Sequence, residues 1–230
     1  GYVDNFTEAV EATPRWPMDT PPMRFVWCGR FSPEKNVEGL LAAWAMFAAS
    51  GSRAQLVLVG DGPRRDALES LVSGFGLEFG GLDRLADAQV IFAGRQSDPA
   101  AFMAGARCLL LSSRAEGLPM VVLESLALGV PVLGSDCPSG GVRTALAGDG
   151  VCDPQRKQGE PAPAGMLLPI PEIDRPGSLD AWVQALAIAA TDDPLHAAWQ
   201  RGARERARYF DGDTARTRWV TMLEALGVSA

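Results

Sequence analysis

The stretch SSRAEGLPMVVLESLALGVPVLG, residues 112–134, reads as the end of a strand, a loop, an apolar helix and a second strand. Pro119 suits the first position of a helix, because its missing N–H would have no partner there. Residues 120–128 continue as an apolar helix, and Gly129 supplies the left-handed residue that ends it. This strand–helix–strand unit is typical of a parallel sheet that is covered by helices.

Two glutamates in this stretch lie eight residues apart, Glu116 in the loop and Glu124 in the helix. Glu124 falls about one and a half turns into that helix. The start of the helix should expose N–H groups and favour an anion, because the helix dipole is positive there. We expect these groups to come from Gly117, Leu118, Met120 and Val121. A carboxylate beside an anion site predicts that a sugar or a nucleotide binds there through its hydroxyl groups.

The composition describes a soluble globular chain rather than a disordered one. Of its 230 residues, 47% are hydrophobic and 21% are charged, and the length suits one large or two small domains. No run of eighteen apolar residues occurs, so no membrane span is expected. The formal charge of −7 argues against a nucleic-acid partner. The first residues are no signal peptide, and the missing initiator Met suggests a cut or processed chain.

The four cysteines show no CxxC spacing. Cys28 and Cys108 fall within or beside apolar strand runs, whereas Cys137 and Cys152 lie in later loops. We therefore expect free thiols in a reducing cytoplasm, rather than disulfides or a zinc site.

Apolar runs and helical patterns alternate along the chain. The expected strands cover residues 23–28, 55–59, 89–93, 108–112, 130–135 and 166–169. The expected helices cover residues 37–50, 64–73, 120–128, 141–147, 179–190, 194–209 and 214–226, with a short one from Pro99. Asn36 and Asp98 are predicted as helix caps. The alternation predicts a Rossmann-like three-layer α/β/α fold with a parallel sheet of about six strands, in which ligands bind at the carboxyl ends of the strands.

The segments between these elements set the expected domain boundaries. The proline-rich residues 1–22 form a linker, residues 23–210 form the α/β domain, and residues 211–230 form a final helix. The Gly-rich residues 74–87 have weak periodicity and are interpreted as a mobile insertion. Residues 148–164 are rich in Pro, Gly and charge, so we expect a surface loop.

Five segments in order resemble the donor domain of the retaining family 4 glycosyltransferases. They are GRFSPEKN at 29–36, VGDGP at 59–63, VIFAG at 90–94, SSRAEGLPMVVLE at 112–124 and SDCPSGGV at 135–142. Glu116 and Glu124 match the E-x7-E pattern of that family. The resemblance covers nearly the whole chain. It implies the C-terminal, nucleotide-sugar-binding half of a GT-B fold, whose final helix would pack toward an acceptor-binding N-terminal domain.

The resemblance assigns a role to each charged residue. Arg30 and Lys35 match the basic pair that holds the donor diphosphate, and two cations beside a helix start suit a pyrophosphate. Glu124 matches the glutamate that binds the ribose hydroxyls. Glu116 matches the glutamate near the transferred sugar, so catalytic roles are implied for Arg30, Lys35 and Glu116.

The resemblance also implies donor contacts that use the main chain. These are expected at Gly94, Arg95, Gly117, Leu118, Pro119, Met120 and Val121. Residues 94 and 95 would contact the base, and the helix start would contact the distal phosphate. Because a base read by main chain leaves no side-chain signature, the sequence does not identify the base, and it leaves the sugar and the acceptor open.

Three other motifs have simple structural interpretations. Asp211-Gly212-Asp213 has the D-x-D form of metal-dependent transferases, but Asp213 is placed as a helix cap. His196, the only histidine, falls on a polar helix and argues against a triad or a metal site. Ser139-Gly140-Gly141 fits either a phosphate nest or a turn.

The expected function is donor binding in a retaining, metal-independent glycosyltransferase that transfers a hexosyl unit to a glycan or lipid-linked acceptor. No cofactor is implied besides the nucleoside-diphosphate sugar, which is the substrate. The chain alone should bind donor but transfer poorly. The expected location is cytoplasmic, with peripheral membrane association of the whole protein left open, and the SDCPSGGV segment is a hint of polysaccharide biosynthesis.

Three alternatives stay open from the sequence. The first is a non-catalytic nucleotide-binding module, which would bind nucleotide without transferring sugar. The second is a sugar-nucleotide epimerase or a phosphorylase of the same architecture, although no acid–base pair for an epimerase is found. A dehydrogenase-like cofactor domain is disfavoured because no G-x-G-x-x-G follows the first strand.

Overall fold

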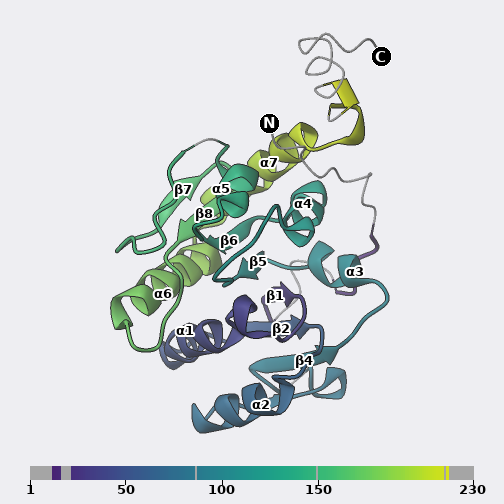
Figure 1. Ribbon diagram of the computed structural model, residues 1–230. Helices are drawn as coiled ribbons and strands as arrows, with labels where there is room; N and C mark the ends of the chain where they lie inside the picture. Colours follow the sequence, from purple (N-terminus) through teal and green to yellow (C-terminus); the bar gives the residue numbers. More distant parts are fainter. Residues whose placement is uncertain (1–11, 17–21, 86, 149, 215, 218–230) are drawn as a thin grey trace.

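The computed structural model describes residues 12–16, 22–85, 87–148, 150–214 and 216–217 (Figure 1). In this part of the chain one sheet of eight strands runs through the molecule, in the order β3-β4-β2-β1-β5-β6-β8-β7. All neighbouring strands are parallel except β7, which pairs antiparallel with β8. The carboxyl ends of all these strands except β7 therefore lie at the same edge of the sheet.

The predicted strands all occur, with ends that move by at most two residues. They are β1 (Arg24–Cys28), β2 (Gln55–Val59), β4 (Val90–Gly94), β5 (Cys108–Leu111), β6 (Val132–Ser135) and β8 (Gly165–Leu168). Except for the last residue of β4, every residue in them is buried. Continuous apolar runs are what a parallel sheet with helices on both faces requires.

Two additional strands lie where the sequence predicted none. The segment interpreted as a mobile insertion contains β3 (Phe79–Gly80) and a 3-10 helix, η2 (Leu82–Arg84), and the expected surface loop contains β7 (Glu160–Ala162). Both predictions were wrong in this respect. Very short strands with Gly or Pro at the edge of a sheet carry no periodic pattern, so sequence patterning does not detect them.

The helices match the predicted positions to within three residues. They are α1 (Val37–Ala49), α2 (Arg65–Gly74), α3 (Pro99–Ala104), α4 (Met120–Ala127), α5 (Gly141–Leu146), α6 (Pro176–Thr191) and α7 (Asp193–Tyr209). The Asp98 side chain accepts the N–H of Ala101 at 3.1 Å, which confirms that cap. Gly129, with φ of 72°, ends α4 as predicted.

The sheet separates two apolar layers. In β1, Phe25 and Trp27 point toward α1, α2 and α6, whereas Val26 and Cys28 point toward α3, α4 and α5. This alternation follows from the period of two residues in a strand. Figure 1 shows α1 and α6 on one side of the sheet and α3 and α4 on the other. Helix α7 packs against α4 and α5.

At each end of the described chain, the structure shows a contact that the sequence did not predict. Within the segment interpreted as a linker, Trp16 is buried and its Nε1–H donates to the carbonyl of Gly105 at 3.0 Å. At the other end, Asp211 rather than Asp213 acts as the cap, because its Oδ1 accepts the N–H of Thr214 at 2.7 Å. Most of the predicted final helix lies outside the described residues.

Strands β6 and β8 approach each other so closely at Gly165 that a side chain there would not fit. The φ of Gly165 is +141°, and a Cβ there would lie 2.0 Å from the carbonyl oxygen of Val132. We expect Gly165→Ala to lower the free energy of unfolding by about 3 kcal/mol, through backbone strain and displacement of β6. Gly177, in the first turn of α6, faces open space, so Gly177→Ala should be neutral or stabilise by about 0.5–1 kcal/mol. Urea unfolding of both variants checks this, and equal stability would contradict it.

Candidate functional site

The loops that carry the predicted site residues leave the same edge of the sheet. Strands β1 and β5 are direct neighbours, with Phe25 opposite Cys108 and Val26 opposite Leu109. Since the strands are parallel, the loop after β1 and the loop after β5 begin side by side. The first loop carries Arg30 and Lys35, and the second carries Glu116.

Lys35 and Glu116 form an ion pair across these two loops. The Nζ atom of Lys35 lies 2.6 Å from Oε1 of Glu116, although the residues are 81 positions apart in the sequence. The Glu116 side chain is only 9% exposed and that of Lys35 is 26% exposed. Two residues predicted for one site are therefore in direct contact. Arg30, on the same loop, is exposed, and the described residues provide no ion pair for its guanidinium.

Asn36 fixes the position of the first loop, though not in the way predicted. Its backbone is left-handed, with φ of 50°, and its side chain does not cap α1. Instead the amide donates to the carbonyls of Ser112, at 3.2 Å, and Pro171, at 2.8 Å. A side chain buried between three segments makes these long-range bonds, which local sequence does not reveal.

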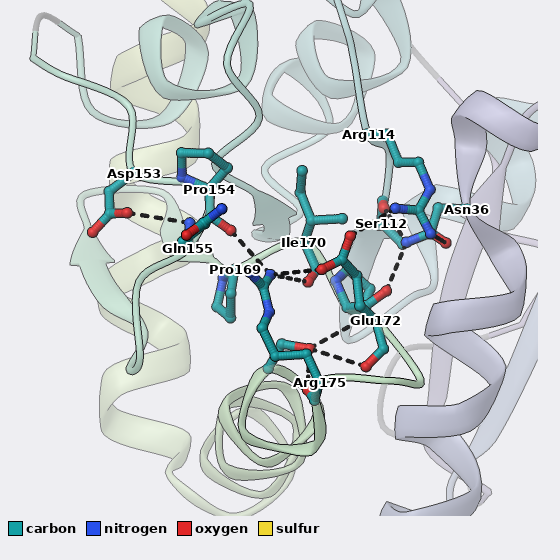
Figure 2. A network of polar contacts seen from close by, with 12 residues as sticks. Asn36, Ser112, Arg114, Asp153, Pro154, Gln155, Pro169, Ile170, Glu172 and Arg175 are labelled. Atoms are coloured by element: carbon teal, nitrogen blue, oxygen red, sulfur yellow. Dashed lines mark hydrogen bonds and ion pairs between the residues drawn. The ribbon is translucent and has the colours of Figure 1, made fainter.

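A second group of polar contacts supports the same region (Figure 2). Arg114 donates to Glu172 at 2.8 Å and to the side-chain oxygen of Asn36 at 3.0 Å. Arg175 donates to the carbonyl of Ile170 at 3.1 Å. The loops after β1, β5 and β8 are thereby joined beside the Lys35–Glu116 pair.

The start of α4 presents free backbone donors. Helix α4 begins at Met120, so Pro119 is the extended residue before the helix rather than its first residue, a shift of one position from the prediction. Among the described residues no acceptor receives the N–H groups of Gly117, Leu118, Met120 and Val121. Gly117 and Met120 are exposed. These N–H groups are available to an anion, as the sequence indicated.

Glu124 lies further along α4 and differs from the other acids of this edge. It is half-buried, and its carboxylate forms no hydrogen bond or ion pair with the residues that the structure describes. Burial raises the pKa of Glu124. Burial of the Cys28 thiol, at the end of β1, raises the pKa of that thiol, and the charge of Glu124 raises it further. A carboxylate in this state has unused acceptor capacity for hydroxyl groups.

The loop after β6 supports the loop that carries Glu116. The Oγ atom of Ser139 accepts the N–H of Glu116 at 2.9 Å. A Cβ at Gly141 would lie 1.3 Å from the carbonyl oxygen of Gly117, so only glycine permits this contact. The Ser139-Gly140-Gly141 motif, with Gly140 left-handed at φ 82°, is thus a turn that holds the Glu116 loop. Sequence reasoning missed this role, because it depends on a contact between two separate loops.

A buried charge network anchors the loop after β6. Asp136 is fully buried and accepts two bonds from Arg143, at 3.0 and 2.7 Å, and one from Arg156 at 2.7 Å. The N–H of Asp153 adds a bond at 2.8 Å. Glu160, in β7, pairs with both arginines at 2.8 Å. Ion pairs therefore connect β7, an edge strand of the sheet, to the loop after β6.

The network shifts the pKa values of its acids. Burial alone would raise the pKa of Asp136, but the bonds from Arg143, Asp153 and Arg156 outweigh it and hold that pKa below its ordinary value. The bond from Arg143 also lowers the pKa of Glu160. The hydrogen bonds that Arg143 donates to Glu160 and Asp136 raise the pKa of Arg143. Both acids are therefore held ionised.

Gly94 and Arg95 lie at the same edge but two strands from β1. Gly94 ends β4 with φ of 69°, and its carbonyl accepts the N–H of Gly60 at 2.9 Å. Arg95 is exposed. Gly60 passes so close to Gly29 that a Cβ would lie 1.8 Å from the Gly29 carbonyl oxygen. Gly60 therefore serves loop packing.

The remaining predicted features behave as structural residues. The ring of His196 is buried and its Nε2 lies 2.7 Å from the carbonyl oxygen of Arg107. All four cysteines are free thiols, as predicted.

Across the described ranges, no three His, Cys, Asp or Glu residues gather closely enough to hold a metal ion. In the same ranges, no helix combines the length and the apolar character needed to cross a membrane.

The chain belongs to the glycosyl transferases group 1 family. Residues 22–160, more than half of the chain, match the model of that family. This range contains β1 to β6, the first residue of β7 and all of the predicted site residues. The recognised resemblance to a glycosyltransferase donor domain is thereby confirmed at the level of the family.

Two relatives illustrate the range of proteins that share this sequence pattern. The chain is 27% identical over 204 residues to a GDP-mannose-dependent alpha-(1-6)-phosphatidylinositol dimannoside mannosyltransferase of Mycobacterium tuberculosis, covering 89% of this chain and 44% of that protein. It is 32% identical over 137 residues to an alpha-D-kanosaminyltransferase of Streptomyces kanamyceticus, covering 59% and 33%. The chain spans less than half of the length of either relative.

Solved structures show the same fold. The lipopolysaccharide outer core galactosyltransferase WaaB superimposes with a TM-score of 0.69 and 21% identity, covering 98% of this chain and 55% of that one. The pneumococcal O-GlcNAc transferase GtfA, in complex with UDP and GlcNAc, gives 0.67 and 17%, covering 98% and 38%. The predicted α/β/α fold, shared with these GT-B structures, is therefore confirmed.

The Asp136 network predicts acid sensitivity. Because the folded pKa values of Asp136 and Glu160 lie below their unfolded values of about 4, the unfolded chain binds more protons there, and stability falls as the pH drops through the folded values. Asp136→Asn should lower the free energy of unfolding at pH 7 by about 3 kcal/mol. It should also make this free energy depend less on pH below about pH 5. Urea unfolding between about pH 3 and 7 measures both effects.

Glu78 provides the control for this prediction. Its side chain is 73% exposed and lies 3.8 Å from Arg84, so Glu78→Gln should change the stability by less than about 0.5 kcal/mol at any pH. An Asp136→Asn protein that matches Glu78→Gln would show that the network adds nothing to stability.

Proposed function

We propose that this chain is the nucleotide-sugar-binding domain of a retaining, metal-independent glycosyltransferase, which transfers a hexosyl unit to a glycan or lipid-linked acceptor. The observation that carries the proposal is the contact of Lys35 with Glu116, 2.6 Å apart, beside the free N–H groups at the start of α4. A cation, an anion-binding helix start and a carboxylate at one edge fit a sugar attached to a diphosphate.

The diphosphate would be bound by Arg30, Lys35 and the N–H groups that precede and begin α4. Lys35 carries three N–H donors, so it can keep its bond to Glu116 and still donate to a phosphate oxygen. Arg30 is exposed and unpaired among the described residues, and its planar guanidinium suits two phosphate oxygens at once. The nucleotide base would lie toward Gly94 and Arg95, where the main chain would contact it.

Glu124 would accept the ribose hydroxyls. Its carboxylate is half-buried and has no partner among the described residues. Two vicinal O–H groups of a neutral polyol could donate to both oxygens without adding charge, so this acid suits a ribose better than the other acids of this edge do. Asp136, in contrast, is saturated by Arg143 and Arg156 and has a structural role.

The same groups account for the chemistry. As the glycosidic C–O bond lengthens, negative charge grows on the leaving diphosphate and positive charge grows on the sugar ring. Arg30, Lys35 and the N–H groups would stabilise the first charge, and Glu116 the second. The diphosphate itself would assist attack from its own side of the ring, so that no protein nucleophile is required and the configuration is retained.

The relatives support the substrate class. One is a mannosyltransferase described as GDP-mannose-dependent, and one solved structure holds UDP with GlcNAc, so the base stays open within nucleoside-diphosphate hexoses. Acceptors of a lipid or polysaccharide kind fit the names of these relatives. Because the chain spans 44% of the length of the mannosyltransferase, we propose that the acceptor binds to another domain. We also propose that the whole protein works in the cytoplasm and associates peripherally with the membrane.

Calorimetric titration tests the proposal most directly. Titrating the chain with UDP, GDP, ADP and NAD, with and without magnesium, should show binding of one nucleoside diphosphate that does not need the metal, and no binding of NAD. Binding of NAD alone would favour a dehydrogenase-like domain. Nucleotide binding by the full-length protein without sugar transfer to any acceptor would favour a non-catalytic module.

Substitutions at the site provide the next test. Lys35→Ala and Glu124→Ala should each weaken nucleoside-diphosphate binding by about tenfold or more, on the scale of one charge-assisted contact. Arg53 and Glu78 are exposed and lie just before β2 and β3, at the opposite end of the parallel sheet, so Arg53→Ala and Glu78→Ala serve as charge controls that should leave affinity unchanged. Unchanged affinity in both site variants would exclude the assignment.

The raised pKa of Glu124 gives the proposal a pH signature. Since burial raises this pKa, the carboxylate takes up its proton at a higher pH than the ordinary value of about 4.3. As the pH is lowered, nucleotide affinity should therefore begin to fall at a higher pH than it would if the contact were made by an exposed glutamate with an ordinary pKa. Glu124→Gln should remove that component and keep the phosphate titration, which both proteins share. Identical pH profiles would show that Glu124 does not contact the ligand.

A further inference from the structure

The carboxylate of Glu116 is held through one of its two oxygens. Oε1 accepts a bond from Nζ of Lys35 at 2.6 Å and a second from Oγ of Ser113, also at 2.6 Å. Oε2 receives no hydrogen bond from any residue that the structure describes. Oε1 is therefore used for contacts within the protein, whereas Oε2 can still accept a hydrogen bond from a ligand.

Both members of the ion pair are fixed from the end of β5. Ser112 and Ser113, directly after that strand, are fully buried. Oγ of Ser112 donates to the main-chain carbonyl of Lys35 at 2.9 Å, while Oγ of Ser113 donates to the side chain of Glu116. Two adjacent serines thus hold the backbone of the cation and the carboxylate of its partner.

The main chain of Glu116 is held independently. Ser139 accepts its N–H, and Gly141 lies against the carbonyl of Gly117. With the backbone fixed on one side and Oε1 fixed by two donors, rotation of the carboxylate would break two charge-assisted bonds at once. Bonds of this kind are about twice as strong as neutral ones, so one orientation dominates.

We propose that Ser113 is a positioning residue, which orients Glu116 so that Oε2 is the oxygen presented to the transferred sugar. The inference rests on the proposed function, in which Glu116 faces the sugar. Ser113 itself is buried beneath Glu116 and does not touch the donor. Its effect is therefore confined to the part of the ligand that Glu116 contacts, the sugar, and does not extend to the nucleoside diphosphate.

This separation defines the experiment. The wild type is first titrated with three sugar nucleotides, UDP-glucose, UDP-N-acetylglucosamine and GDP-mannose, and with the corresponding nucleoside diphosphates, UDP and GDP. The sugar nucleotide that the wild type binds, and its nucleoside diphosphate, are then titrated into Ser113→Ala. We expect Ser113→Ala to weaken binding of the sugar nucleotide by about fivefold to tenfold, the scale of a hydrogen bond to a charged group. Binding of the nucleoside diphosphate alone should change by less than about twofold.

Ser125 provides the matched control. It is equally buried, and its hydroxyl makes one hydrogen bond, to the carbonyl of Val130 at 2.9 Å, away from the Lys35–Glu116 pair. Ser125→Ala should leave both affinities unchanged. Thermal unfolding of both serine variants shows whether they fold equally well.

A double-mutant cycle with Glu116→Ala, which removes the acceptor of the Ser113 hydroxyl, tells positioning from a general structural effect. If Ser113 acts through the Glu116 carboxylate, Ser113→Ala should have almost no further effect on sugar-nucleotide binding in the Glu116→Ala protein. An equal loss in both backgrounds, or an equal loss for the nucleoside diphosphate alone, would overturn the proposal. Failure of the wild type to bind any nucleoside diphosphate would instead overturn the proposed function, and with it this inference.

Discussion

The parallel pairing of β1 with β5 brings together two segments that are far apart in the sequence, and the whole candidate site depends on it. Because Phe25 lies opposite Cys108, the two strands end at the same level, and the loops that follow them leave side by side. The ion pair between Lys35 and Glu116 is the direct consequence. A different strand order would separate these loops, and the site would not form.

The acids at this edge divide into two kinds according to their partners. Asp136 is completely buried and saturated by two arginines, a state that suits a permanent structural role. Glu124 is half-buried with no partner among the described residues, and burial raises its pKa. Burying an unpaired carboxylate is unfavourable, so a protein keeps one chiefly where a ligand completes its hydrogen bonds. Glu116 lies between these two cases, with one oxygen bound and the other without a partner in the described chain.

The supports of the site come from segments that carry no site residue themselves. The loop after β6 holds Glu116 through Ser139 and Gly141, and that loop is in turn anchored to β7 through Asp136, Arg143 and Glu160. The edge strand therefore contributes to the site at a distance. Membership in the glycosyl transferases group 1 family relates the core of this arrangement to other transferases, and the chain spans 44% of the length of the mannosyltransferase relative.

The sequence by itself determined the layered fold, because continuous apolar strands and amphipathic helices carry strong local patterns. The predicted central strands occur within two residues of their positions, and the residues of the GRFSPEKN and E-x7-E motifs lie at one sheet edge. The tertiary structure alone decided the rest. The short strands β3 and β7 depend on a neighbouring strand for their hydrogen bonds, and so leave no pattern of their own. Asn36, Ser113 and Ser139 hold the site through bonds between loops, whose partners only the folded chain brings within reach.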